Sequence, residues 1–239
     1  MEANCTWSAP RRFARAFLRL TAPLGVLAFW CGMAAAAHVY PAGYDWRFQT
    51  ISVLLYSDHN PHGYLSAWAG LELCALCGLV WTSHLKRRLE GAGSGSPVLG
   101  RRWLRAGFVC MCLAVLPDRV LRVSKMHELM AIGAFVGICI GVMQELYLTR
   151  DIRKTHGARG TVARLGTFAQ AGAPLVPVLF AGMTQAYLAL ARPTLPWVSP
   201  AWRARGISPY LSFAVWEWVS CVVFSACILV LCRRRMDDW

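Results

Sequence analysis

The residues best suited to chemistry lie between Tyr44 and Gly63, in a segment that separates two long apolar stretches. Aromatic, acidic and imidazole side chains are mixed more densely there than in any other segment between apolar stretches. Imidazoles and carboxylates act as general acids and bases, and they also bind divalent metals such as zinc. The apolar middle of the segment, Ile51–Leu55, would let the loop fold back onto the membrane. If the chain is an enzyme, we expect the reaction to take place beneath this loop.

A metal site is the first chemistry that this loop suggests. Asp58, His59 and His62 are ligand-type residues at a spacing that is typical of metal sites. Pro61 breaks any helix there, so the three side chains need not share a face. Asp118 follows a later apolar stretch and is expected on the same side of the membrane. We therefore predict a zinc-like divalent ion as a cofactor, bound by these three loop residues and Asp118.

Two acidic residues within apolar stretches indicate a polar site inside the membrane. Glu72 lies eight residues into one predicted membrane helix and Glu217 seven residues into another, at depths of about 12 Å and about 10 Å. An acid in a membrane helix costs about 2.5–3.5 kcal/mol on insertion scales, so it normally faces other helices or a wet cavity. We expect both acids to line a cavity. The competing interpretation is a structural hydrogen bond to a neighbouring helix.

His127 begins another apolar stretch and is the imidazole best placed to reach the top of such a cavity. With Glu217 it would form a catalytic acid–base pair, and Glu72 would complete the polar floor. A structural histidine at a helix end is one alternative, and a nucleophilic triad with Ser52 or Ser57 is another. A basic group just before this stretch suits the binding of a phosphate headgroup: Arg119, Arg122 and Lys125.

The elements that position these residues are predicted to be membrane helices. Of the 239 residues, 56% are hydrophobic and only 15% are charged, and the mean hydropathy is +0.41. A soluble domain is nearer a quarter charged. The long apolar stretches predict an all-α helical bundle, because backbone groups in lipid must be satisfied internally. We expect one integral membrane domain over residues 1–239, with six transmembrane helices at about 21–38, 64–83, 103–117, 126–149, 165–190 and 210–231.

The distribution of Lys and Arg predicts the side of the membrane that each loop faces. With six helices, 18 of the 25 basic residues fall at the two termini and in the second and fourth loops. The positive-inside rule therefore places both termini in the cytoplasm. The loop from Tyr44 to Gly63 is then non-cytoplasmic, and the membrane itself, plasma or secretory, is left open.

Two of the predicted helices have features that deserve a separate interpretation. Pro174 and Pro177 are expected to kink or break the fifth helix. Ala34 to Ala37 would suit a signal-peptide cleavage site after the first apolar stretch. We favour a retained first helix, because the other stretches then give an even number of spans with consistent sidedness.

The net charge of +13 does not indicate nucleic-acid binding, because the basic residues cluster at the ends of apolar stretches. Topology and contact with lipid headgroups account for that arrangement. Most of the ten cysteines lie inside apolar stretches, where a free cysteine acts as a small apolar side chain. Cys74 and Cys77 have the spacing of a redox pair, but they are in the middle of a span, away from aqueous thiol exchange. Membrane lipids are therefore the expected partners.

Four short motifs stand at positions that suggest a family: Ile51-Ser52, Asn60-Pro61, His127 and Glu217-Trp218. With six expected spans and cytoplasmic ends, this pattern resembles the DRAM/Frag/Sfk-like membrane proteins. That family includes the Golgi protein that acts in lipid remodelling of GPI anchors. Its members usually continue Ile-Ser with Asp-Thr-Gly, where this chain has Val53-Leu54-Leu55. The resemblance implies a lipid-handling role at the non-cytoplasmic leaflet, with Ser52, His127 and Glu217 at the matching positions.

The predicted function is to act on a lipid or lipid-linked substrate in a polar cavity open to the non-cytoplasmic leaflet. The expected chemistry is acid–base or metal-assisted hydrolysis or acyl transfer. A proton-initiated polyprenyl cyclase is a second enzyme class, because a buried acid among aromatic side chains would also serve it. The rival class is a non-enzymatic lipid-binding, scaffold or transport protein. A transporter should show inverted repeats or paired broken helices, and only the fifth helix is clearly interrupted.

Overall fold

The computed structural model describes residues 8–41, 43–90, 98–115, 124–155, 172–191 and 201–237, and all the regular structure in these ranges is helical. The predicted all-α architecture is confirmed for them. The long helices are α1 (Ser8–His38), α3 (Tyr64–Glu90), α4 (Val98–Val115), α6 (Ser124–Thr155), α8 (Leu175–Ala191) and α10 (Phe213–Asp237). Three short helices occupy the connections: α2 (Ile51–Leu55), α9 (Ala201–Ala204) and the 3-10 helix η1 (Pro209–Leu211).

Four of the long helices are long and apolar enough to cross a membrane. Their apolar segments are Leu20–His38, Tyr64–Ser83, Met126–Tyr147 and Phe213–Arg233. The fold is therefore that of a multi-pass helical integral membrane protein. The other two long helices differ from a simple span: α4 contains three arginines, and α8 has only 17 residues, about 26 Å of helix.

The prolines of the predicted fifth span lie at the beginning of α8. Gly172 is helical, Ala173 and Pro174 form a turn, and α8 starts at Leu175. Pro177 is in the first turn of α8, where a missing backbone N–H leaves no intrahelical hydrogen bond unmade. Within the described residues, a turn thus lies at the predicted interruption, directly before α8.

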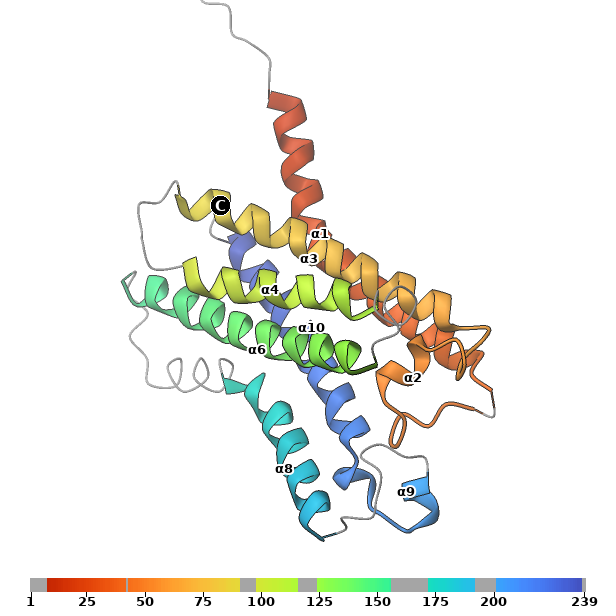
Figure 1. Cartoon of the computed structure of the whole chain (residues 1–239). Helices are drawn as coiled ribbons and strands as arrows, with labels where there is room; N and C mark the ends of the chain where they lie inside the picture. Colours follow the sequence, from red (N-terminus) through yellow and green to blue (C-terminus); the bar gives the residue numbers. More distant parts are fainter. Residues whose placement is uncertain are drawn as a thin grey trace, which may run out of the picture.

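Close approach of backbones joins the helices into two pairs, α1 with α3 and α4 with α6, and α4 also packs on α3 (Figure 1). A Cβ atom added at Gly70 of α3 would lie 2.7 Å from the carbonyl oxygen of Ala28 and 2.9 Å from the Cα of Gly32 in α1. The same holds between α4 and α6, where a Cβ at Gly107 would lie 2.7 Å from the backbone nitrogen of Ile138. Glycine lets membrane helices gain van der Waals contact that lipid would otherwise provide.

Helix α10 crosses the two pairs and carries α8 at its side (Figure 1). It packs on α1, where the indole Nε1 of Trp30 donates a hydrogen bond of 3.1 Å to the hydroxyl of Ser225. It also packs on α6. The shared core includes these fully or nearly buried side chains: Leu104, Phe108, Ile138, Val142, Phe224 and Ile228.

Candidate functional site

The loop between α1 and α3 is bound to the bundle through its short helix α2. We call residues 43–63 the docked loop. Ile51 and Leu54 of α2 are buried among other helices, whereas the sequence predicted a return of this segment to the membrane, which stays a prediction. They pack with Phe29 and Met33 of α1 and with Leu71 of α3 in one apolar cluster. The loop therefore covers the end of the α1–α3 pair.

Glu217 of α10 binds the first backbone N–H of this short helix. The N–H of Ile51 donates a hydrogen bond of 2.8 Å to Oε2 of Glu217, and the glutamate is only 9% exposed. The first N–H groups of a helix have no partner within the helix, and Thr50 at the N-cap makes no side-chain cap. A carboxylate from a helix 166 positions away in the sequence fills that role. The structural alternative for Glu217 is thus partly realised, with a loop helix as the partner.

A second polar contact lies beside Glu217, where Tyr44 and Trp218 meet. The hydroxyl of Tyr44 donates to the carbonyl oxygen of Gln49 at 2.7 Å, with the carbonyl oxygen of Thr50 at 3.1 Å. The indole N–H of Trp218 donates to the same hydroxyl at 2.9 Å. Burial raises the pKa of Tyr44 well above its ordinary value, so this side chain stays a neutral phenol. Adjacent residues of α10, Glu217 and Trp218, therefore both bind the docked loop.

His127 lies at the other end of α2. Its side chain is 6% exposed, and Nδ1 is 2.6 Å from the carbonyl oxygen of Ala114 near the end of α4. Because a carbonyl oxygen only accepts, Nδ1 carries the proton, and in the neutral ring Nε2 then has the lone pair of a base. The ring also contacts Tyr56, which ends α2, at a centroid distance of 5.3 Å. The structure thus gives His127 a fixed orientation and a contact with the docked loop.

Glu72 lies at a different helix interface from Glu217. Its carboxylate lies beside Cys112 of α4. The Oε1 atom is buried and has no hydrogen-bond partner among the described residues. Glu217 faces α2 whereas Glu72 faces α4, and no contact joins either acid to His127 within the described part of the chain. Of the three predicted catalytic residues, only Glu217 and His127 therefore contact the docked loop.

The predicted metal ligands of the loop are all on its surface. Asp58, His59 and His62 are exposed, and the ring of His59 lies edge-on to Tyr56 at 6.1 Å. Over the described ranges no three His, Cys, Asp or Glu side chains are grouped to hold a metal ion. Asp118 lies outside the described residues, so metal ligation stays a prediction from the sequence.

The remaining predicted residues have mixed outcomes. Arg119 and Arg122 lie outside the described residues, and of Lys125 only the backbone, in the first turn of α6, is described. The hydroxyl of Ser52 is 2.7 Å from that of Thr50, at the start of α2. Ser57 is exposed on the loop surface. The proposed phosphate-binding group is accordingly untested, and no triad partner contacts either serine among the described side chains.

Asn60 has a role that sequence reasoning did not assign, although its motif was noted. It is fully buried, and its Nδ2 donates to the carbonyl oxygens of Ala36 at 3.1 Å and Leu54 at 3.4 Å. Its Oδ1 accepts the N–H of Gly63 at 3.2 Å, and a Cβ at Gly63 would lie 2.6 Å from Nδ2. Asn60 therefore ties α1 and α2 to the start of α3. The only sequence signal was a polar residue before Pro61 at the beginning of an apolar stretch.

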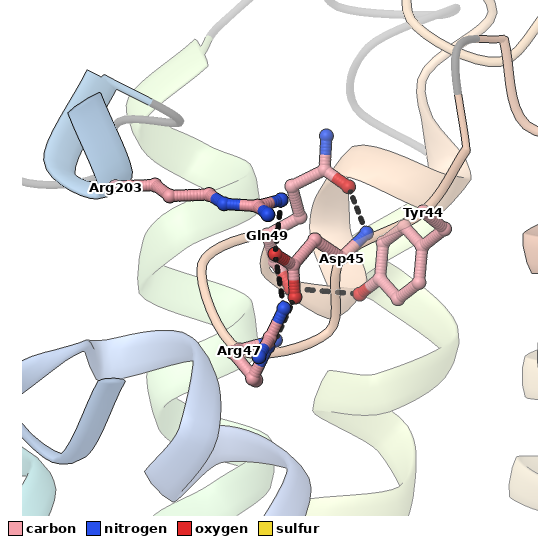
Figure 2. A network of polar contacts seen from close by, with 5 residues as sticks. All are labelled: Tyr44, Asp45, Arg47, Gln49 and Arg203. Carbon is pink, nitrogen blue, oxygen red and sulfur yellow. Dashed lines mark hydrogen bonds and ion pairs between the residues drawn. The ribbon is translucent and has the colours of Figure 1, made fainter. Parts of the chain in front are cut away.

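The docked loop also contacts the loop between α8 and α10 through Asp45 (Figure 2). Nε of Arg47 is 2.8 Å from Oδ1 of Asp45, and its Nη2 is 3.1 Å from Oδ2. Nη1 of Arg203 is 3.4 Å from Oδ2 of the same carboxylate. The hydrogen bond from Arg47 holds the pKa of Asp45 below its ordinary value. The backbone N–H of Asp45 donates to Oε1 of Gln49 at 2.7 Å, which links this contact to the Tyr44 contacts.

The chain is thus a multi-pass helical membrane protein whose docked loop is bound by a buried glutamate and contacted by a buried histidine. Comparison of the chain with protein-family models, with curated proteins and with solved structures gives no match. The likeness to the DRAM/Frag/Sfk-like proteins stays an expectation from the sequence.

Proposed function

We propose that the protein acts on a lipid or lipid-linked substrate at the non-cytoplasmic side of the membrane. The observation that carries the proposal is the position of Glu217, a buried acid within an apolar helix that reaches the N-terminus of α2. An acid at such a place is costly and normally marks a site with a polar function. A site beneath a loop at one end of the bundle would be reached from the lipid or from the water when the loop moves aside.

The proposed chemistry is acid–base catalysis by Glu217 and His127. Glu217 contacts the first residue of α2 and His127 contacts Tyr56, just after its last residue. Five residues of helix separate these points by about 7.5 Å along its axis. A substrate group that lies between the two side chains would let one give a proton while the other takes one, as hydrolysis or acyl transfer requires. Ser52, in the first turn of α2, is on the same segment.

The sidedness in this proposal follows from six spans with both termini in the cytoplasm. In addition to the four spanning helices, it takes α4 and α8 as spans, with the arginines of α4 toward the cytoplasm. A membrane-impermeant maleimide tests it in intact cells, with single cysteines introduced at Ser94 and at Arg205. We expect labelling at position 205 alone. Labelling at position 94 from outside would reverse the sidedness of the docked loop.

The function itself is tested by comparing the lipids of cells that lack the protein with those of cells that express variants. Glu217→Gln keeps the shape of the side chain and removes its titratable proton. We expect it to reproduce the lipid profile of the deletion while the protein still folds. Glu128→Gln is the matched control, because Glu128 is an exposed acid in the first turns of α6. A normal profile in cells with Glu217→Gln would rule out the catalytic role.

A non-enzymatic lipid-binding protein is the second candidate, and one observation favours it. Nδ1 of His127 and Oε2 of Glu217 are both already engaged by backbone groups of the protein. If these side chains only fix the docked loop, Glu217→Gln should leave the lipid profile intact, since an amide oxygen also accepts a hydrogen bond. Glu217→Leu should then change it, because the loop would no longer be bound.

A further inference from the structure

Two arginines from loops far apart in the sequence meet at one carboxylate. Arg47 binds Asp45 through two nitrogens, and Arg203 approaches the same carboxylate from 158 positions away (Figure 2). An ion pair as exposed as this one adds little to the stability of a fold. A gain in stability therefore does not explain why the two arginines meet at this carboxylate.

The meeting of the two arginines is imposed by buried neighbours. Phe48 follows Arg47 and is 6% exposed, and Trp202 precedes Arg203 and is 2% exposed. Both belong to one apolar cluster with Leu188 of α8. Burial of these rings fixes the backbones of both loops, so the two guanidinium groups are held side by side by packing and not by the ion pair alone.

The group formed by Arg47, Arg203 and Asp45 carries a net positive charge and has N–H donors that the contacts with Asp45 do not use. Two guanidinium ions share one carboxylate, and the hydrogen bond from Arg47 keeps Asp45 ionised by lowering its pKa. The contacts with Asp45 use two nitrogens of Arg47 and one of Arg203. The side chains of Arg47 and Arg203 are 44% and 69% exposed, so a ligand in the water can reach both of them. A planar fork of donors of this kind matches the oxygens of a phosphate group.

We propose that Arg47 and Arg203 form a binding site for the phosphate group of a ligand, carried by a lipid headgroup or by a soluble phosphate. The inference rests on the proposed function, because it names the headgroup chemistry of the substrate. The site lies on the same loop as the Glu217 contact: Gln49 joins Asp45 to Tyr44, and Ile51 binds Glu217. A phosphate held here would place the adjoining part of a lipid toward α2.

Binding to the purified full-length protein in a non-ionic detergent tests the site. The probes are dioctanoyl phosphatidic acid, dioctanoylglycerol as the same lipid without phosphate, and inorganic phosphate as a competitor. We expect phosphatidic acid to bind, and Arg47→Gln and Arg203→Gln each to weaken it by about tenfold or more. Arg205→Gln is the matched control, an exposed arginine of the same loop that makes no contact with Asp45, and should change affinity by less than about twofold.

The outcomes separate the source of the phosphate from the existence of the site. Displacement by inorganic phosphate at concentrations close to that of the lipid identifies a site for phosphate on any carrier, whereas displacement only at far higher concentrations identifies the lipid headgroup. Equal binding of dioctanoylglycerol, an equal loss in Arg205→Gln, or no loss in the Arg47 and Arg203 variants would overturn the site. Since no turnover is measured, these results are independent of the lipid profile of Glu217→Gln, which tests the proposed function.

Discussion

The α1–α3 and α4–α6 pairs are held by backbone contacts, whereas the α8–α10 pair is held by side chains. Glycines of the first two pairs face a neighbouring backbone within 3 Å of where a Cβ would be, as at Gly70 and Gly107. In α8, a Cβ at Gly182 would meet nothing within 4 Å. The contact between α8 and α10 includes instead the stacked rings of Phe180 and Trp216, with centroids 4.6 Å apart.

The two glycine-packed pairs, α1–α3 and α4–α6, should therefore require more free energy to deform than the regions that are held by side chains. Backbone atoms in direct contact have no side chain that can move aside, so a helix pair of this kind has few alternative arrangements. The docked loop, by contrast, is held by side chains: hydrogen bonds from Glu217 and Trp218 of α10, and two apolar clusters that include Ile51 and Leu54 in one and Phe48 in the other. Regions with few buried contacts open at lower free energy than the rest of a fold. Moving the docked loop aside for a substrate should therefore cost less than separating a helix pair that is held by backbone contacts.

The largest expected effect comes from breaking a glycine contact. Gly70→Leu places a side chain against the carbonyl oxygen of Ala28 and the backbone of Gly32, neither of which can move without separating α1 from α3. We expect a loss of about 3 kcal/mol or more in stability. In a chain of this size that lowers the melting temperature in detergent by about 6–12 °C. Gly182→Leu is the control and should change it little; an equal loss in both variants would contradict the comparison.

The next effect comes from Glu217. Glu217→Leu leaves the N–H of Ile51 buried without an acceptor, which costs about 1–3 kcal/mol. Glu217→Gln keeps an acceptor oxygen and should cost less than about 1 kcal/mol. Melting temperature and limited proteolysis within residues 43–63 measure both effects, and we expect faster cleavage in the leucine variant only. Equal cleavage rates for the parent protein and Glu217→Leu would show that Glu217 does not fix the loop.

A smaller effect is expected at Tyr44. Tyr44→Phe removes the acceptor for the indole N–H of Trp218 and the donor to the carbonyl oxygen of Gln49. The loss should be about 1–2 kcal/mol, since both groups are partly buried. Tyr210→Phe serves as the control, because Tyr210 is 73% exposed. A melting temperature that falls equally in the two variants would remove Tyr44 from the contacts that hold the loop.

The sequence predicted the elements of this fold better than their contacts. Apolar stretches end where charge or proline begins, and so the second predicted span, 64–83, coincides with the apolar part of α3. The apolar sequence of Ile51–Leu55 predicted a loop that folds back onto the membrane. These residues form α2, whose Ile51 and Leu54 pack on the helix bundle, and contact with the membrane itself stays a prediction. The helix that contains the third predicted span begins at Val98, five residues before that span, and the side chain of Arg101, which was assigned to a loop, is buried.

The contacts of the site could not be predicted from the sequence, and the reason is physical. The partners of Glu217 and His127 are a backbone N–H and a backbone carbonyl, which every residue has and no pattern marks. Asp45 and Arg203 are separated by 158 positions, so their meeting depends on how α8 and α10 place the second loop. What the sequence did indicate was depth: an acid seven residues into a predicted apolar helix needs a partner in the bundle.

The smallest expected effect concerns the charge of Asp45. Its pKa lies below the ordinary value because Arg47 binds the ionised form, so the native state favours the carboxylate. A lowered pKa stabilises the fold at pH values above the ordinary pKa of 3.8, and this stabilisation is lost as the pH falls through the lowered value. The pair is exposed and screened by solvent, and its effect on stability should therefore be the smallest of the four. Comparing the melting temperatures of the parent protein and Asp45→Asn at several pH values measures it. The difference in melting temperature should be constant from about pH 5 to 7 and shrink below about pH 4, because the parent protein then also loses the charge of Asp45.

Added salt should reduce this difference in melting temperature at pH 7, since the two arginines are largely exposed. A difference that persists unchanged at pH 3 would mean that Asp45 acts through its shape and backbone contacts, and that its charge does not help to join the two loops.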